Sequence, residues 1–237
     1  MTIPRLVEEI QRFQYKVEIK NELVNVISIE DELYLSSTYQ LNPRKVQQLS
    51  LKNGILPLRY SKNYNPLGIN GQLSLLHSTI GVVGVGELGK AVIEIIARIG
   101  IGHIIIIDHK DLNETNFTIE NNIGIKKITA AAKQVEKINS GVSTTLYSIK
   151  LNQKNVLQLL DPCDVVVDAT NDKDSSILLE NTVNDLNIPL VHSNQHDFTN
   201  QVTPKSTKNE YNLSYCNSFM TANRQAQEVV NSIAKNI

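Results

Sequence analysis

The spacing of apolar residues in the first part of the chain favours short strands. Residues 13–19 alternate apolar and polar side chains with a period of two, and residues 24–29 and 33–35 continue the alternation. Polar or charged residues separate the three runs. Because a period of two is typical of a strand with one buried face, the pattern predicts three antiparallel strands.

A short helix is predicted directly after these strands. Asn42 offers an N-cap side chain, Pro43 fits the first helical position, and Val46 and Leu49 share one face before Gly54 ends the helix. Three strands and one helix bury little apolar area. We therefore expect this module, residues 1–58, to pack against the remainder of the chain, residues 59–237.

From residue 78 onward, long apolar runs alternate with helical patterns. The predicted strands are 79–83, 104–107, 144–149, 164–168 and 189–192, and the predicted helices are 90–98, 125–139, 156–160, 175–186 and 220–237. Continuous apolar strands between helices are typical of a parallel sheet that is covered on both faces. The fold class is therefore α/β, with a doubly wound, mainly parallel sheet.

A glycine motif connects the first of these strands to its helix. Gly84, Gly86 and Gly89 form a G-x-G-x-x-G pattern, and Asp108 ends the next strand. In this Rossmann-like context the helix N-terminus offers N–H groups to phosphate, and the carboxylate accepts from a ribose hydroxyl. The alternative is that the glycines only allow close packing of the helix on the sheet.

Composition removes several classes of function. The 237 residues carry 23 Lys and Arg against 24 Asp and Glu, a net charge of −1, which disfavours nucleic-acid binding. The two cysteines, Cys163 and Cys216, are too few for a disulfide framework or a four-thiolate zinc site. No apolar run approaches the roughly 20 residues of a membrane span, so a cytoplasmic protein with no membrane partner is expected.

Several spaced motifs then narrow the fold to a family. They are Arg59-Tyr60-Ser61-Lys62-Asn63, the segment from Asp108 to Asn116, Gly124-Ile125-Lys126-Lys127 and Asp168-Ala169-Thr170-Asn171-Asp172. Together they resemble the adenylating enzymes of the ubiquitin-activating, ThiF and MoeB family over about residues 59–198. The resemblance implies that ATP binds at the glycine loop and that a carboxy terminus is adenylated with magnesium. It places the nucleotide site at Gly84, Gly86, Gly89, Asp108, Asn116 and Lys127.

The chain departs from that family pattern mostly at charged positions. Ile119 replaces an arginine, Glu120 a glutamine, Lys110 an acid, Lys62 an arginine, Asn171 the magnesium aspartate and Glu87 a glycine. Loss of a transition-state cation removes kilocalories of stabilisation. The expectation is a vestigial ATP site, no cofactor and no enzyme activity. The alternative is an active adenylating enzyme in which Asp172 and Lys62 replace the family residues, and a dinucleotide-dependent oxidoreductase is a further alternative.

Other reactive side chains carry less weight. Cys216 has no cluster of basic residues near it in sequence, so we interpret it as inert, and Cys163 precedes a buried strand. His192, His196 and Asp197 form a conceivable metal set, but no helix aligns them, so no metal is predicted.

The N-terminal module resembles the winged-helix-like precursor-peptide recognition element of enzymes that modify ribosomally made peptides. Such a module binds a leader peptide as an extra strand between its third strand and its helix. The resemblance places the peptide against Leu33, Tyr34, Leu35, Arg44, Lys45, Val46, Gln48 and Leu49. The alternative is that Tyr34 and Leu49 only pack inward.

With both features, the chain resembles the ThiF-like partner proteins of azole-peptide and thiopeptide pathways, including micrococcin-type ones. They imply a non-catalytic scaffold that presents a precursor peptide to a YcaO-type cyclodehydratase and then to a flavin dehydrogenase. The gain in rate would come from effective concentration. A homodimer through the last helix, from Met220 to Ile237, is also expected.

Overall fold

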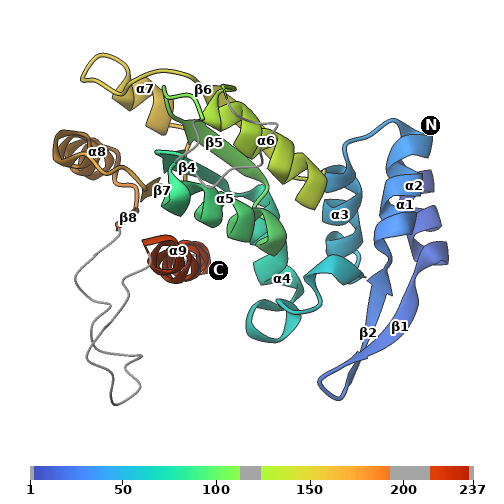
Figure 1. Cartoon of the computed structure of the whole chain (residues 1–237). Coiled ribbons are helices and arrows are strands. Elements are labelled where there is room, and N and C mark those ends of the chain that lie inside the picture. Colours follow the sequence, from blue (N-terminus) through green and yellow to red (C-terminus); the bar gives the residue numbers. More distant parts are fainter. Residues whose placement is uncertain (1–2, 113–123, 193–213, 235–237) are drawn as a thin grey trace.

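The computed structural model describes residues 3–112, 124–192 and 214–234, the side chains of 214–217 excepted. Figure 1 shows the elements in order. They are α1 (Ile3–Phe13), β1 (Tyr15–Ile19), β2 (Glu22–Ile27), α2 (Ile29–Tyr39), α3 (Pro43–Lys52), β3 (Leu56–Pro57), the 3-10 helix η1 (Leu58–Tyr60), α4 (Tyr64–His77), β4 (Thr79–Val83), α5 (Glu87–Ile99), β5 (His103–Ile107), α6 (Lys127–Ile138), β6 (Ser143–Tyr147), α7 (Val156–Leu160), β7 (Val165–Asp168), α8 (Lys173–Leu186), β8 (Leu190–His192) and α9 (Ser214–Ala234).

The larger part of the protein is a parallel five-stranded sheet in the order β6-β5-β4-β7-β8. Helices α5, α6 and α9 pack on one face, and α7 and α8 on the other. The chain adds β5 and β6 on one side of β4 and then β7 and β8 on its other side. The carboxyl ends of β4 and its two neighbours therefore border the switch point where such sheets bind ligands. The predicted doubly wound α/β fold is confirmed.

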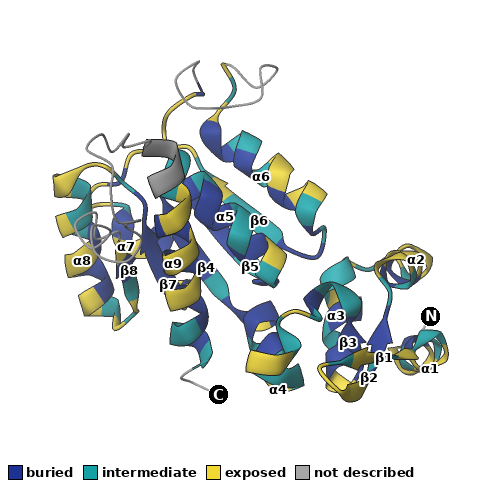
Figure 2. Cartoon of the chain, turned by 60° about the horizontal axis from the view of Figure 1, so that its bottom comes forward, coloured by how far each residue is buried: buried dark blue, intermediate teal, exposed yellow. Residues whose placement is uncertain are grey.

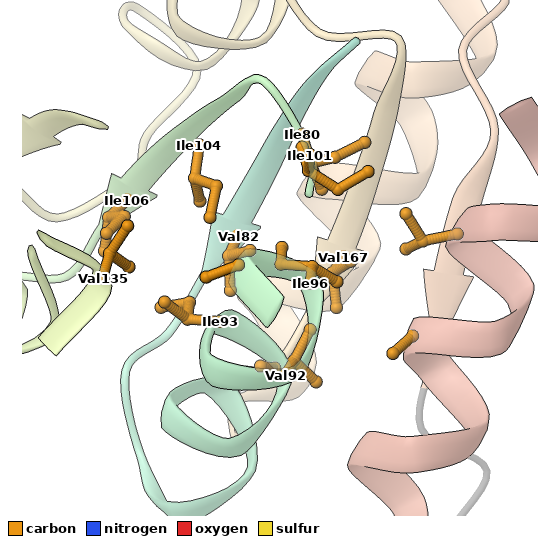
Figure 3. Packing of buried hydrophobic residues seen from close by; sticks show 14 of the residues in the cluster. Ile80, Val82, Val92, Ile93, Ile96, Ile101, Ile104, Ile106, Val135 and Val167 are labelled. Atoms are coloured by element: carbon orange, nitrogen blue, oxygen red, sulfur yellow. The ribbon is translucent and has the colours of Figure 1, made fainter. Parts of the chain in front are cut away.

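The core of the sheet consists of the apolar runs that marked its strands. Ile80 and Val82 of β4 and Val167 of β7 lie against Ile93 and Ile96 of α5 (Figure 3). Figure 2 shows the same central strands as the buried centre of the fold. Burial on both faces explains the continuous apolar runs, since alternate side chains of β4, β5 and β7 enter different clusters.

The last helix, α9, packs against α5 in the core on the same face of the sheet. Its buried side chains, Ala222, Ala226, Val229 and Ile233, recur at three- and four-residue spacing. The predicted helix is present, and it begins earlier than expected, at Ser214.

The N-terminal module differs from its prediction in two elements. Residues 33–35 do not form a strand but lie in α2, so the predicted edge strand is wrong. Ser28 caps this helix by accepting from the N–H of Asp31, and Glu30 and Asp31 place acids in its first turn. A second helix, α1, precedes the strands and was missed. The three-residue alternation at 33–35 is too short to outweigh a capped helix.

The small sheet nevertheless has three strands, in the order β1-β2-β3. The hairpin of β1 and β2 is antiparallel, and the two-residue β3 pairs in parallel with the end of β2. Helix α3 begins at Pro43 after the Asn42 cap, as predicted.

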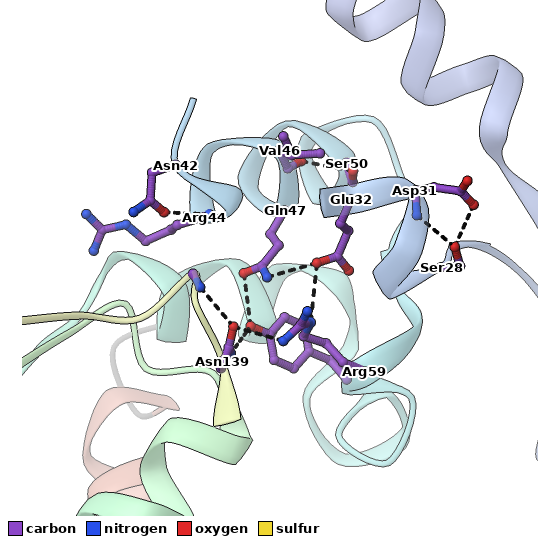
Figure 4. Close-up of polar contacts among 12 residues, drawn as sticks. Ser28, Asp31, Glu32, Asn42, Arg44, Val46, Gln47, Ser50, Arg59 and Asn139 are labelled. Carbon is purple, nitrogen blue, oxygen red and sulfur yellow. Dashed lines mark hydrogen bonds and ion pairs between the residues drawn. The ribbon is translucent and has the colours of Figure 1, made fainter. Parts of the chain in front are cut away.

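The module packs at the amino end of the large sheet, and a buried polar network joins the two parts. Tyr60 donates to Gln47 Oε1 (3.0 Å) and accepts from Asn139 Nδ2 (2.9 Å), while Gln47 Nε2 donates to Glu32 (3.0 Å). Arg59 pairs with Glu32 at 3.3 Å and donates to Asn139 at 3.0 Å (Figure 4). These contacts fix the module's orientation on the sheet.

None of the helices in the described part of the chain is both long and apolar enough to span a membrane.

Candidate functional site

The glycine loop makes a tight turn between β4 and α5. Gly84 has a φ of +91°, and a Cβ there would lie 2.6 Å from the carbonyl oxygen of Ala169. A Cβ on Gly89 would lie 1.9 Å from the carbonyl oxygen of Gly84. Gly86 has open space around it and caps α5 with its backbone. The first N–H groups of α5 are therefore reached across a residue without a side chain, as phosphate binding requires.

Asp108 stands beside this loop at the end of β5. Its Oδ2 accepts from the N–H of Val85 in the glycine loop, and its Oδ1 accepts from the N–H of Lys110, both at 2.8 Å. The carboxylate is therefore fixed at the carboxyl end of the sheet, between the loop and the segment after β5. The contact of this carboxylate with a ribose stays a prediction.

Lys127 and Lys90 bring positive charge to the same end of the sheet. Lys127 is the first residue of α6 and is 8% exposed. Lys90 lies in the first turn of α5, and burial lowers the pKa of its ammonium. The carboxylate of Glu87 raises the pKa of Lys90 and the charge of Lys127 lowers it, so both side chains are electrostatic neighbours of Lys90.

The carboxyl end of β7 forms the other side of the site. Asp168 is 4% exposed, and its Oδ1 accepts from both the N–H (2.9 Å) and the hydroxyl (2.6 Å) of Thr170. His192, at the end of β8, has Nδ1 3.6 Å from Asp168 Oδ2. The amide of Gln225 in α9 donates to the Asp168 carbonyl at 3.3 Å. The turn that begins at Asp168, which matches a family motif, is thus held in place by contacts from β8 and α9.

The two residues that the alternative relied on have different surroundings. Asp172 is the N-cap of α8, and its carboxylate accepts from the N–H and the hydroxyl of Ser175, which lower its pKa. Lys62 is exposed after η1. Asp172 lies at the carboxyl end of the sheet, whereas Lys62 follows the segment that joins the module to the sheet.

Some predicted residues lie outside the described part of the chain. They are Asn116, Ile119, Glu120, His196, Asp197 and the side chain of Cys216. Cys163 is described, and it is buried against Gly81 with a raised thiol pKa, as expected for a structural cysteine.

The eight predicted peptide contacts separate into three groups. Three are buried in the core of the module, two point to the large sheet, and three remain accessible. Leu35, Val46 and Leu49 are buried; Arg44 donates to the carbonyl of Gly102 and to Ser143, and Gln48 to the carbonyl of Leu76; Leu33, Tyr34 and Lys45 are exposed. A site between a third strand and α3 is therefore wrong for the first two groups, because α3 faces the sheet.

Sequence reasoning missed the residues of the buried polar network. Glu32 is fully buried, and burial raises the pKa of its carboxyl to about 7 despite the neighbouring Arg59. Glutamate and glutamine are residue types that usually lie on the surface, so the sequence offered no sign of their burial. Only the Arg59-Tyr60 pair stood in a recognised motif.

Comparison with known proteins places this geometry in a family. The model of the ThiF family matches residues 60–236, which is most of the chain. The chain belongs to the ThiF family. The match includes the glycine loop, Asp108, Lys127 and α9, and it begins at the second residue of the Arg59-Tyr60 pair.

Similar ThiF-family proteins include curated enzymes. "Adenylyltransferase and sulfurtransferase MOCS3" of Anopheles gambiae is 33% identical over 178 residues, covering 67% of this chain and 40% of that protein. "SAMP-activating enzyme E1" of Haloferax volcanii is 31% identical over 152 residues, covering 61% of this chain and 56% of that protein. The chain thus spans about two fifths to just over half of the length of these relatives.

Solved structures show the same fold. E. coli tRNA N6-threonylcarbamoyladenosine dehydratase, TcdA, in complex with AMP is 27% identical with a TM-score of 0.55, covering 57% of each chain. E. coli MccB, solved with MccA-N7isoASN, is 19% identical with a TM-score of 0.60, covering 87% of this chain and 72% of that one. Because 87% exceeds the share that residues 60–236 represent, the likeness in fold to MccB extends into the N-terminal module.

These relatives correct the prediction that this ThiF-family chain is not an enzyme. The prediction rested on charged residues missing from the family pattern. However, the similar proteins are named adenylyltransferases, and TcdA has been solved with AMP and with ATP. The structure also keeps the loop, an acid and a buried lysine together. The prediction counted the family residues that are missing and did not consider the arrangement that the remaining residues form.

Proposed function

We propose that this protein is an ATP-dependent adenylating enzyme that activates a carboxyl group of a peptide or carrier protein. The observation that carries the proposal is the conjunction of the open glycine loop, Asp108 and the buried Lys127 in a fold whose relatives are named adenylyltransferases. The loop N–H groups and Lys127 bind phosphate, and Asp108 orients the ribose.

The reaction follows from this placement. A carboxylate oxygen of the substrate attacks the α-phosphorus of ATP, the bond to the bridging oxygen breaks, and pyrophosphate leaves with the electron pair. The product is an acyl adenylate. Since such transfer depends on positioning and on neutralising charge, the helix N-terminus of α5 and Lys127 contribute electrostatically.

Magnesium would accompany the nucleotide. In such sites it is held by one or two carboxylates and by the substrate phosphates. Asp172 supplies an exposed carboxylate in the turn that carries the family's metal ligand, so the residues present fit the ion. Its tie to Ser175 fixes the carboxylate and lowers its pKa, which keeps it ionised.

The N-terminal module is proposed to hold the peptide. Six of the twelve large apolar side chains exposed on the described surface belong to it: Ile3, Tyr15, Leu23, Ile29, Leu33 and Tyr34. The ring of Tyr34 lies 5.7 Å from that of Phe13. In the described sheet, β1 pairs only with β2, so its other edge offers backbone groups to an added strand.

The positions of the module and the loop set a minimum length for the peptide. The module contacts the amino end of the sheet, and the glycine loop lies at the carboxyl end. The five-residue β4 separates the two ends by roughly 16 Å. A peptide held by the same chain therefore needs at least about five extended residues between the bound segment and its reactive end. A leader peptide, a YcaO-type cyclodehydratase, a flavin dehydrogenase and a second copy of the chain stay predicted partners.

The proposal is tested by ATP–pyrophosphate exchange with the purified protein, magnesium and candidate peptides. We expect exchange with a peptide that has a free carboxyl group and none with its carboxy-terminal amide. Asp108→Asn should lower the exchange rate, whereas Asp161→Asn, an exposed acid after α7, should not. Absence of exchange with every carboxylate substrate, together with absence of ATP binding, contradicts the proposal.

A further inference from the structure

Strand β6 contacts the N-terminal module at one end and the proposed nucleotide site at the other. The hydroxyl of its first residue, Ser143, accepts from Arg44 of α3 in the module, at 3.1 Å. The carbonyl of its last residue, Tyr147, accepts from the N–H of Asp108, at 3.2 Å. The five residues of β6 span roughly 16 Å. This strand therefore covers the distance that a peptide held by the module must cross.

The outer edge of β6 carries backbone groups that no described strand pairs with. In the described sheet, β6 is the last strand on its side and pairs only with β5. The N–H of Ser143 and the carbonyl of Tyr147 form hydrogen bonds to the segment that contains β5. Because backbone groups alternate in direction along a strand, those of Thr144 and Leu146 point to the open edge. Such an edge can pair with an added strand.

A groove of about 310 Å³ lies between β6 and α6, which packs along this strand (Figure 1). It extends from Thr129 in the first turn of α6 to Ser140 after the helix, and Thr144 of β6 also lines it. Its two charged lining residues, Lys133 and Glu136, have opposite signs, so the groove favours neither anions nor cations. Hydroxyl groups beside an open strand edge suit a polypeptide backbone, which is polar and uncharged.

The two ends of the groove lie at the two places that the peptide has to connect. Ser140 follows Asn139, which accepts from Arg59 at the boundary between the module and the sheet. Thr129 lies two residues after Lys127, at the carboxyl end of the sheet. The module holds an earlier segment of the peptide, and the reactive carboxyl group is at its carboxy terminus. The peptide therefore runs in the same direction as β6.

We propose that the substrate peptide binds along the outer edge of β6 as a sixth, parallel strand, with alternate side chains facing the groove beside α6. This inference rests on the proposed adenylation and adds the route by which the peptide reaches the nucleotide. The hydrogen bonds of the main chain supply the affinity, so this segment of the peptide tolerates different side chains, and no single side chain of the groove dominates binding.

The first test uses a peptide that supports ATP–pyrophosphate exchange and replaces its backbone N–H groups, one at a time, by N-methyl groups. In a strand paired on one edge, alternate N–H groups face β6. Methylation at every second position should therefore raise the KM of the peptide by about 3- to 10-fold. Methylation at the positions between is the matched control and should change the KM by less than about twofold. An equal effect at all positions, or an effect at none, overturns the inference.

The second test does not depend on adenylation. Amide hydrogen exchange of the wild-type protein is measured by NMR with and without a random-sequence mixture of decapeptides that have free carboxyl groups. At a peptide concentration about ten times the dissociation constant, the amides of Thr144 and Leu146 should exchange about tenfold more slowly. The amide of Leu190, which faces outward from the opposite edge strand β8, is the control and should not change.

The two tests separate this inference from the proposed function. If the amides of Thr144 and Leu146 are protected but no peptide supports ATP–pyrophosphate exchange, the proposed adenylation fails and the sixth strand stands. If peptides support ATP–pyrophosphate exchange without this protection, the adenylation stands and the sixth strand is overturned. Absence of protection overturns the sixth strand in either case.

Discussion

The two ends of the large sheet use similar residue types for opposite purposes. At the amino end, the half-buried Arg59 contacts the buried Glu32 and Asn139 across the boundary between module and sheet. At the carboxyl end, Lys127 is equally buried, yet no described carboxylate pairs with it. Buried polar groups that contact each other hold two parts together, whereas a buried charge without a protein partner indicates a ligand.

The Arg59-Tyr60 motif and the glycine motif lie at opposite ends of the sheet. Arg59 and Tyr60, which match the family's Arg-Tyr pair, lie at the boundary between the module and the sheet, where Tyr60 is fully buried. The described residues expected at the nucleotide, which are Gly84, Gly86, Gly89, Asp108 and Lys127, lie at the other end. A family residue lost at one end of the sheet therefore says little about function at the other end, because the described residues of the two ends do not share contacts.

The largest effect is expected from removing the buried charge at the carboxyl end. Lys127→Met should lower the ATP–pyrophosphate exchange rate by about 10²- to 10³-fold, the usual cost of losing one electrostatic group at a transition state. The melting temperature should not fall, because the lysine has no ion-pair partner among the described residues. Lys133→Met, exposed on the same helix, is the control. If K127M lost stability to the same extent as activity, Lys127 would be a structural residue, and the two ends of the sheet would not differ in this respect.

The next effect is expected at the amino end. Arg59→Met removes the partner of a buried carboxylate and should lower the free energy of unfolding by about 3 kcal/mol, measured by denaturant titration. The exchange activity per folded molecule should stay within about twofold of wild type, because Arg59 lies at the boundary between the module and the sheet. Arg98→Met is the control, since its ion pair with Glu94 is on the surface and is worth about 0.5 kcal/mol or less. A selective loss of activity in R59M would place Arg59 in the nucleotide site.

The pH dependence of stability sharpens the same contrast. Burial raises the pKa of Glu32 from 4.5 to about 7, so between these values the folded protein holds a proton that the unfolded chain has released. Wild type therefore loses stability relative to Glu32→Gln as pH rises from 4.5 to 7, by about 3 kcal/mol, and the difference is constant above and below this window. Denaturant titrations of both proteins at several pH values measure it. A difference that grows with pH would show that Glu32 is stabilised as an anion.

The smallest effect is expected on the surface of the module. Tyr34→Ala should weaken binding of a substrate peptide by about tenfold, the loss of one aromatic contact, and change stability by less than about 1 kcal/mol. Fluorescence anisotropy of a labelled peptide measures the affinity. Ile177→Ala, a similarly exposed residue on α8, is the control. Equal affinity for wild type and Y34A would remove Tyr34 from the peptide site.

Much of the fold and part of the site could be predicted from the sequence. The apolar runs predicted the five strands, and the Asn42-Pro43 pair predicted the start of α3. The glycine motif and Asp108 were placed correctly at one end of the sheet. The helix over residues 29–39 was not predicted, although Ser28 and the acids after it are typical of a helix start.

What the sequence determined by itself is local: strand periodicity, helix caps and the tight turn that Gly84 and Gly89 allow. These follow from backbone sterics and from burial on one or two faces, which neighbouring residues specify. Only the tertiary structure decided that Glu32 is buried beside Arg59 and that Gln225 donates to the carbonyl of Asp168. Each of these pairs joins elements far apart in the chain, and whether a charge is solvated, paired or left for a ligand depends on which elements the fold brings around it.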